Sequence, residues 1–178
     1  MPITLRTILS VLTLAVILSA ANHASAASHA PIHAPKLSLP GRAETVSLDS
    51  TTARLTLVDF WASWCVPCRK SFPWMATLHE RYGAHGLRIV AINLDKEREA
   101  AEQFLAELKP PFTIAFDPAG KSAEAFHVKA MPSSFLVDST GVIVYSHAGF
   151  DPKKTATLEA MIQKAWPDRK STRLNSSH

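Results

Sequence analysis

The sequence predicts an α/β domain built on a central mixed sheet flanked by helices. From Glu44 onward, short apolar runs rich in β-branched and aromatic residues alternate with amphipathic stretches, a pattern typical of α/β folds. Between two of these runs, Asp138-Ser139-Thr140-Gly141 has the composition of a turn, so the two strands should form an antiparallel hairpin. The part of the chain between its two ends is about 140 residues long, the size of one domain with its own hydrophobic core.

Each predicted element follows from its apolar pattern. The predicted strands cover residues 45–48, 55–60, 87–93, 112–116, 134–137 and 142–146. The predicted helices cover residues 66–82, 96–108, 122–127 and 153–166. The last helix follows Asp151-Pro152, since an aspartate caps the first turn of a helix and a proline fits its first position. The expected order is therefore β-β-α-β-α-β-α-β-β-α.

The N-terminus predicts an export signal. A positive charge at Arg6 precedes the apolar run 8–21 and the small-residue cleavage pattern Ala24-Ser25-Ala26, so we expect a signal peptide over residues 1–26. The apolar run has about 14 residues, fewer than the roughly 20 that span a bilayer, which makes an uncleaved anchor the weaker alternative. Residues 27–38, rich in Ala, His, Pro and Ser, are expected to form a linker. The predicted location is the periplasm or an equivalent exported space.

The C-terminal residues 168–178 resemble the in-frame translation of a sequencing adapter. We therefore expect this tail to be an artefact and the folded domain to cover residues 39–167, with a natural polar tail as the alternative. The predicted signal peptide and the tail together contain four of the 19 basic residues and one of the 15 acidic residues. The rest of the chain therefore has a net charge near +1. Such a balance gives no support for nucleic acid or anionic lipid as a partner.

The chain has two cysteines, in the segment Trp64-Cys65-Val66-Pro67-Cys68. A predicted strand leads into this segment, and the helix that follows has Cys65 at its N-terminus. Unpaired backbone N–H groups and the positive end of the helix dipole favour a thiolate there, so Cys65 is the predicted nucleophile. Cys68, one turn further on, can attack a mixed disulfide and release the substrate. Pro67 costs no hydrogen bond in the first turn and stiffens the loop.

Three other interpretations of the cysteine pair compete with this one. A structural disulfide between residues so near in sequence would gain little from loop closure. A zinc site would add His79 and His85, but His79 lies about 16 Å from Cys68 along the predicted helix, too far for one ion. A copper-carrying site would combine the two cysteines with His127 or His147.

Two segments of the sequence resemble a known family. Residues 57–73, with the cysteines at their centre, and residues 131–138, which read Met-Pro-Ser-Ser-Phe-Leu-Val-Asp, are similar to the TlpA/ResA-like branch of the thioredoxin family. The resemblance covers about residues 38–166. It implies a thioredoxin fold with an extra N-terminal strand and, at residues 100–116, a helix–strand insertion. The chain departs from thioredoxin itself at Ala91, where thioredoxin has a lysine near its buried carboxylate.

The resemblance also assigns roles outside the cysteine pair. It implies that Pro132 is a cis-proline packed against the disulfide and that the Met131 backbone pairs with an extended substrate strand. It implies that Asp59 is a buried carboxylate that accepts the proton of the second cysteine. Burial in an apolar strand should raise the pKa of this carboxyl group, whereas a solvated aspartate at a sheet edge is the alternative. Trp61 and Trp64 are expected to flank the site, to shield it and to offer an apolar surface to partners; plain core packing is the alternative, and it suits Trp61 better than Trp64.

These features together predict a thiol-disulfide oxidoreductase. The family resemblance favours a reductase that acts on protein disulfides and is itself reduced by a membrane thiol donor. The two half-reactions need no bound cofactor or metal beyond the redox-active cysteine pair. We expect a monomer. The alternatives are a disulfide oxidase or isomerase and a dithiol module that carries copper.

Overall fold

A five-stranded mixed sheet forms the centre of the structure, a computed structural model that describes residues 30–49 and 53–166. Its strands are β3 (Leu55–Trp61), β4 (Leu87–Asn93), β5 (Thr113–Phe116), β6 (Ser133–Asp138) and β7 (Ile143–Ala148). They lie in the order β5-β4-β3-β6-β7, with β3, β4 and β5 parallel and with β6 antiparallel to both β3 and β7. The predicted mixed sheet is therefore confirmed, and it lies wholly within the compact unit that begins at Pro31.

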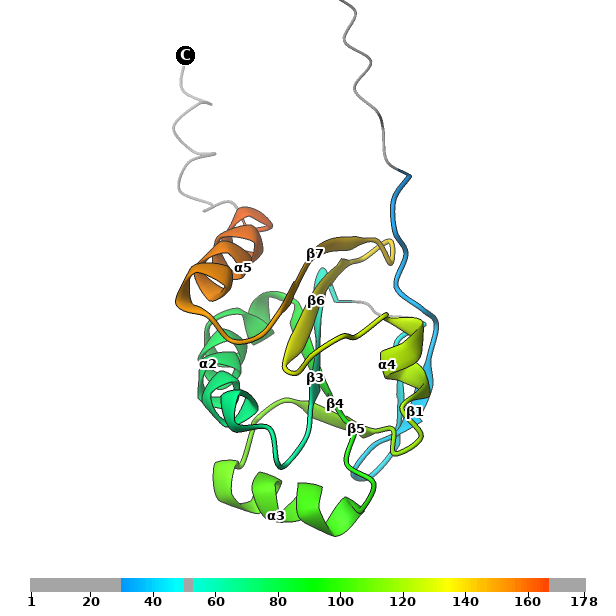
Figure 1. The fold of residues 1–178 in the computed structure, drawn as a ribbon. Helices are drawn as coiled ribbons and strands as arrows, with labels where there is room; N and C mark the ends of the chain where they lie inside the picture. Colours follow the sequence, from blue (N-terminus) through cyan, green and yellow to red (C-terminus); the bar gives the residue numbers. More distant parts are fainter. Residues whose placement is uncertain (1–29, 50–52, 167–178) are drawn as a thin grey trace, which may run out of the picture. The chain divides into compact units, whose positions relative to one another are not determined.

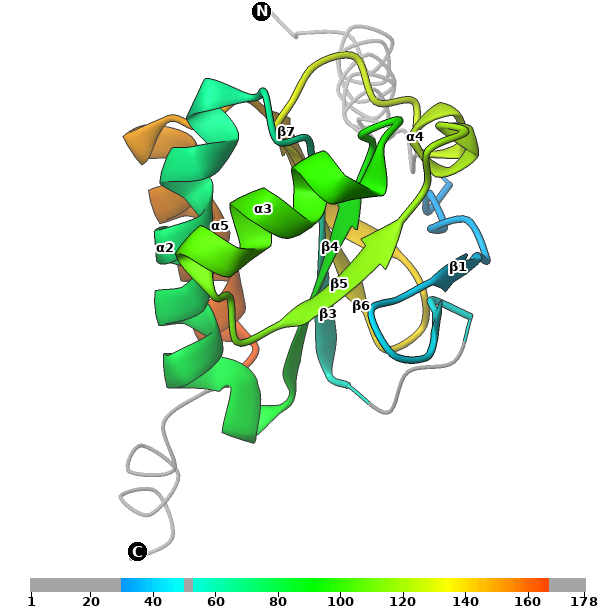
Figure 2. The same ribbon diagram turned by 90° about the horizontal axis from the view of Figure 1, so that it is seen from below.

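Helices and a small hairpin cover the two faces of this sheet (Figure 1; Figure 2). One face is covered by α2 (Val66–Tyr82), α3 (Arg98–Leu108) and α5 (Pro152–Lys164). The other face is covered by α4 (Lys121–Ala125) and by an antiparallel hairpin of β1 (Ser38–Pro40) and β2 (Thr45–Ser47). A short 3-10 helix, η1 (Gly83–His85), links α2 to β4. In the described ranges, no helix has the length and apolar character needed to cross a bilayer.

Strand β3 separates two hydrophobic cores and is buried along its whole length. Leu57 and Trp61 belong to the core under α2, α3 and α5, whereas Val58 and Phe60 belong to the core on the opposite face. Burial on both sides is typical of a central strand whose two faces are covered. Because side chains alternate along a strand, Asp59 faces the first of these cores, which also contains both cysteines.

The structure contains every helix and strand that the sequence predicts, with ends displaced by at most two residues. Helix α3 begins at Arg98 rather than Lys96, because the Asp95 carboxylate bonds to Ser63 and Asn93 and holds the preceding residues as a loop. Strand β1 was not predicted, since three residues that end in a proline show no alternation. The expected extra N-terminal strand is thus half of a hairpin outside the central sheet.

Two predicted local features are confirmed: the turn between the last two strands and the capped start of the last helix. The turn between β6 and β7 is closed by the Gly141 N–H, which donates to the Asp138 carbonyl at 3.0 Å. Helix α5 begins with a capping carboxylate, because Asp151 accepts from the backbone N–H groups of Lys153 and Lys154.

Part of the predicted linker packs against the sheet. His33 forms an antiparallel bridge with Val142, and the Ala34 N–H donates to the Gly141 carbonyl at 2.8 Å. Isolated backbone pairs of this kind leave no periodic pattern, so the sequence gives no sign of them. The predicted signal peptide (1–26), the start of the linker (27–29) and the tail (168–178) lie outside the described residues.

Candidate active site

The two cysteines lie where β3 leads into α2 and are joined by a disulfide, with their Cα atoms 5.3 Å apart. Cys65 is the N-cap residue of α2, and its sulfur accepts a hydrogen bond from the Cys68 N–H at 3.3 Å. Cys65 is 5% exposed, whereas Cys68 is fully buried. A sulfur at a helix N-terminus is stabilised as an anion by the unpaired N–H groups and the helix dipole. Cys65 is therefore the less buried of the two cysteines and the one whose sulfur has a stabilising environment.

The surface around Cys65 is apolar. Trp64 and Val66, its two neighbours in the chain, are 70% and 71% exposed. Trp61, which we expected to flank the site with Trp64, is instead fully buried. Its ring packs on Phe72 from α2, with centroids 4.9 Å apart, and on a phenylalanine of α3. Trp61 is thus a core residue and offers no surface to a partner, while Trp64 does.

A buried polar network fixes the loop that leads to Cys65. The Asp95 carboxylate, in a side chain that is 6% exposed, accepts from the Ser63 N–H at 2.8 Å and from the Ser63 hydroxyl at 3.0 Å. The Asn93 side-chain amide donates to the same carboxylate at 2.7 Å. The sequence did not predict this network, although a polar residue that ends a buried strand and a carboxylate two positions later are a signal for such a role. Asp95 thereby positions Ser63, two residues before the nucleophile.

We expect replacement of Asp95 with alanine to loosen this loop. The substitution leaves the Ser63 N–H and the Asn93 amide without their shared partner, and each unmet buried group costs about 1–3 kcal/mol. Chemical denaturation should show this loss, and hydrogen exchange of the Ser63 amide should accelerate. Glu97→Ala is the matched control, because Glu97 lies in the same loop, is exposed and makes no capping hydrogen bond. Equal stability of the two variants would contradict the positioning role.

Asp59 is fully buried on the side of the sheet that faces the cysteines. The Ser134 hydroxyl donates to its Oδ1 at 2.6 Å, and its Oδ2 has no hydrogen-bond partner among the described residues. Burial raises the pKa of Asp59 to about 7, and the hydrogen bond from Ser134 opposes this rise only in part. The residue opposite Asp59 on β4 is Ala91, so no lysine pairs with the carboxylate from that strand. The solvated aspartate considered as an alternative is therefore excluded, and the carboxyl group titrates near neutral pH.

The loop before β6 packs against the core that contains the disulfide. The Met131–Pro132 peptide bond is cis, as the family resemblance implied. Met131 packs against the core that contains both cysteines, and the Pro132 carbonyl accepts from the Gly149 N–H at 2.7 Å. In the part of the chain that the structure describes, the Met131 backbone makes no hydrogen bond. Its N–H and carbonyl are therefore open to another strand.

The histidines considered as metal ligands are not gathered around the cysteines. Within residues 30–49 and 53–166, no three His, Cys, Asp or Glu side chains are grouped so that they could hold a metal ion. His79 lies on α2 and His147 on β7. The structure thus supplies no ligand set for the zinc or copper interpretation among these residues.

Three features together define a thiol-disulfide oxidoreductase with a thioredoxin-like fold. They are the mixed sheet, the helix capped by the first of two closely spaced cysteines, and the cis-proline loop that packs against the same core. The chain belongs to the Redoxin family, whose sequence profile matches residues 27–162, and is a TlpA/ResA-like member of the thioredoxin family.

Individual relatives agree with this assignment. The chain is 30% identical over 122 residues to thiol-disulfide oxidoreductase ResA of Bacillus cereus, a match that spans 68% of this chain and 69% of that protein. It is 37% identical over 112 residues to the thiol:disulfide interchange protein DsbE homolog of Paracoccus denitrificans, spanning 62% and 60%. A crystal structure from Chlorobium tepidum, assigned as thiol:disulfide interchange protein DsbE, superposes with a TM-score of 0.73 at 43% identity and covers 77% of this chain and 97% of that one.

Proposed function

We propose that this chain is an exported reductase of protein disulfides, which works in the periplasm and is returned to its dithiol form by a membrane thiol donor. The observation that carries this proposal is the position of Cys65, the less buried of the two cysteines, which caps α2 between the exposed apolar side chains of Trp64 and Val66. An enzyme becomes a strong oxidant when its reduced form is stabilised. The hydrogen bond to the Cys65 sulfur stabilises a thiolate there, but Cys68 is fully buried and burial penalises its thiolate; this limit on the stability of the reduced form supports the reducing direction.

The reaction proceeds in two displacements. In the reduced enzyme, the Cys65 thiolate attacks one sulfur of a substrate disulfide, forms a mixed disulfide and expels the other substrate sulfur as a thiolate. Asp59, as the carboxylate, accepts the proton of Cys68 through water. The Cys68 thiolate then attacks the Cys65 sulfur and expels the second substrate thiolate. The enzyme ends with the Cys65–Cys68 disulfide, and the substrate has gained two electrons.

The substrate is an extended protein segment around a disulfide. The open N–H and carbonyl of Met131 can pair with such a segment as an added strand. Trp64 and Val66 offer it an apolar contact beside the sulfur that reacts. Backbone hydrogen bonds and apolar contacts recognise an exposed, extended segment rather than a particular amino-acid sequence. Disulfide-containing segments of several partner proteins would therefore fit this surface.

Replacement of Trp64 with alanine tests this docking surface. Because the side chain is 70% exposed, we expect the free energy of unfolding to change by less than about 0.5 kcal/mol. The kcat/KM for a protein disulfide should fall about tenfold, since an exposed tryptophan at a contact surface often dominates binding. The kcat/KM for a small aromatic disulfide should change far less. Ile32→Ala is the control, because Ile32 is 71% exposed but lies far from the cysteines in the chain; a similar loss there would contradict the proposal.

Redox titration of the cysteine pair tests the direction of transfer. A midpoint at or below about −200 mV, near the glutaredoxins and thioredoxin, supports a reductase. A midpoint above about −150 mV would instead indicate an oxidase that donates disulfides. Fractionation of cells that express the chain tests the location, and recovery in the cytosol would contradict the periplasmic part of the proposal.

A further inference from the structure

One face of α2 connects the cysteine site with the loop that follows β7. Val66, Lys70 and Trp74 are spaced four residues apart, so Lys70 lies between the other two on this face. The Trp74 ring packs on the ring of Phe150, with centroids 5.9 Å apart. Because Val66 adjoins Cys65 in the chain, this face runs from the reactive sulfur to the loop after β7, and the exposed Lys70 lies along it.

The loop after β7 also contacts the cis-proline loop and binds a second lysine. The Gly149 N–H donates to the Pro132 carbonyl at 2.7 Å, next to the open backbone of Met131. The Lys154 ammonium, in the first turn of α5, donates to the Ala148 carbonyl at 2.6 Å. This carbonyl and the Gly149 N–H belong to one peptide group, so the ammonium lies one peptide group away from the cis-proline loop.

The cis-proline loop carries a third lysine. Lys129 is exposed and lies two residues before Met131. None of the four ion pairs found among the described residues includes Lys70, Lys129 or Lys154. The carboxylate of Asp151, in the loop after β7, accepts from two backbone N–H groups as the cap of α5. The surface formed by α2, the cis-proline loop and the loop after β7 therefore carries three ammonium groups without ion-pair partners in the part of the chain that the structure describes.

Positive charge on the α3 side of the site is balanced. Lys96, which follows the β4 end of the sheet, is close in the chain to the exposed Glu97 and Glu99. Arg69 forms an ion pair with Glu107 of α3. An acidic partner would therefore find its counter-charges on the side of Cys65 that holds the cis-proline loop.

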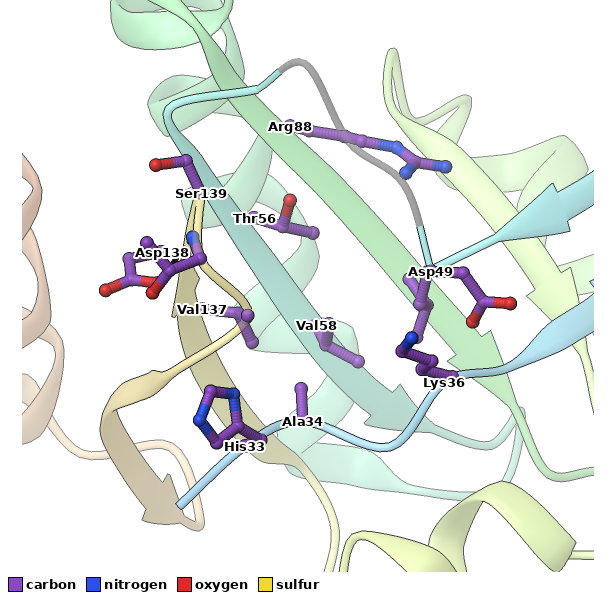
Figure 3. Close-up of a pocket in the computed structure, with 13 residues that line it drawn as sticks. His33, Ala34, Lys36, Asp49, Thr56, Val58, Arg88, Val137, Asp138 and Ser139 are labelled. Carbon is purple, nitrogen blue, oxygen red and sulfur yellow. Dashed lines mark hydrogen bonds between the residues drawn. The ribbon is translucent and has the colours of Figure 1, made fainter. Parts of the chain in front are cut away.

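Positive charge on the opposite face of the sheet is balanced as well. A pocket of about 240 Å³ on that face is lined by Lys36 and Arg88 together with the carboxylates of Asp49 and Asp138 (Figure 3). The cations of this pocket share its lining with an equal number of carboxylates. The lysines beside the cysteine site lack such company, which distinguishes their surface from the pocket.

We propose that the surface carrying Lys70, Lys129 and Lys154 selects protein disulfides that are flanked by acidic residues. The inference rests on the proposed function and adds a charge preference to the apolar contact at Trp64. A substrate strand paired with the Met131 backbone places side chains on both sides of its cysteine, and the long, flexible lysine side chains can reach carboxylates there. Opposite charges across a contact speed association, whereas like charges disfavour the wrong partners.

Three synthetic peptides with the same intramolecular disulfide, flanked by aspartate, serine or lysine, test the proposal. At low ionic strength the reduced full chain should react with the aspartate peptide about tenfold faster than with the serine peptide, and with the lysine peptide more slowly. Each rate is divided by the rate at which dithiothreitol reduces the same peptide, because flanking charges also alter the disulfide itself. In 1 M NaCl, where charges are screened beyond about 3 Å, the three normalised rates should converge.

Matched variants assign the preference to the named side chains. Lys70→Gln and Lys129→Gln should each reduce the normalised rate of the aspartate peptide about twofold to fivefold, and more than they reduce that of the serine peptide. Lys36→Gln is the control, because Lys36 is also exposed but lies in the pocket of the opposite face. Equal normalised rates for the aspartate and lysine peptides at low salt, or an equal loss in Lys36→Gln, would overturn the proposal.

Failure of this inference and failure of the reductase proposal give different results. The oxidised enzyme docks the reduced peptides on the same surface, so the charge preference should appear for reaction in either direction. Fast reaction with the reduced peptides alone would contradict the reductase direction and would still measure the charge preference. Competition with the aspartate peptide by phosphatidylglycerol vesicles, and not by phosphatidylcholine vesicles, would assign the surface to an anionic membrane and overturn the inference.

Discussion

Cys68→Ser is expected to arrest the enzyme as stable mixed disulfides on Cys65. Cys65 is the less buried cysteine, and its sulfur accepts an N–H hydrogen bond at the start of α2, so it makes the first attack. Without the Cys68 thiol, nothing within the site displaces the bound partner. Non-reducing electrophoresis of the variant exposed to oxidised substrate proteins should show covalent adducts, and mass spectrometry should place each bond at Cys65.

Cys65→Ser is the matched comparison for Cys68→Ser. Because it removes the nucleophile itself, the reductase activity should fall by at least about a thousandfold. Cys68 is fully buried and cannot reach a substrate disulfide, so few adducts should form. In the reduced wild type, iodoacetamide should modify Cys65 faster than Cys68 at mildly acidic pH. Equal trapping by the two variants, or equal alkylation of the two sulfurs, would show that the nucleophile is misassigned.

The sequence was sufficient to predict the cysteine site because its parts are close in the chain. An apolar strand that runs into two cysteines, with proline between them, predicts the helix N-terminus at which Cys65 lies. An aspartate within that apolar run also predicts burial of Asp59. The two tryptophans differ for a local reason. Strand β3 continues one residue beyond the predicted end, so Trp61 keeps the alternation and enters the core, while Trp64 lies in the loop.

Features that join distant segments could not be predicted in this way. The bond between Ser63 and Asp95 links residues 32 apart, and no periodicity or motif relates them. Thr56 in a strand matches ordinary β-propensity, so the sequence gives no sign that its buried hydroxyl lacks a hydrogen-bond partner among the described residues. Tertiary packing decides these contacts, and it is specified by the whole fold rather than by any one segment.

Asp59→Asn is expected to remove the acid–base group and to change how stability depends on pH. The carboxyl group has a pKa of about 7 in the folded protein, against a usual value of 3.8. At neutral pH a part of the enzyme therefore holds the carboxylate that accepts the Cys68 proton. Loss of such a base costs about 10²–10⁴-fold in rate. We expect the resolution step, followed by stopped-flow release of the second substrate thiol, to slow by about a hundredfold and to lose its pH dependence near 7.

Asp59→Asn should slow the reaction, but it should stabilise the folded protein above neutral pH. Between pH 4 and 7 the folded protein keeps the Asp59 proton that the unfolded chain releases, so the free energy of unfolding falls as pH rises through this window. About three pK units correspond to roughly 4 kcal/mol, lost by pH 8. Asp59→Asn lacks this loss and should be more stable than the wild type at pH 8. Denaturation of the oxidised protein is the suitable measurement, because the disulfide removes both thiols from the titration.

Ser134→Ala separates this effect from other titrating groups. The variant loses the hydrogen bond that lowers the pKa of Asp59, so the decline in stability should extend to higher pH. Burial and Lys154 lower the pKa of His147, so this residue contributes the reverse trend at and below its usual pKa of 6.5. It is present in all three proteins, and its contribution cancels in the comparison. If wild type and Asp59→Asn lose stability in parallel from pH 4 to 8, Asp59 does not titrate in this range, and the proton must leave Cys68 by another route.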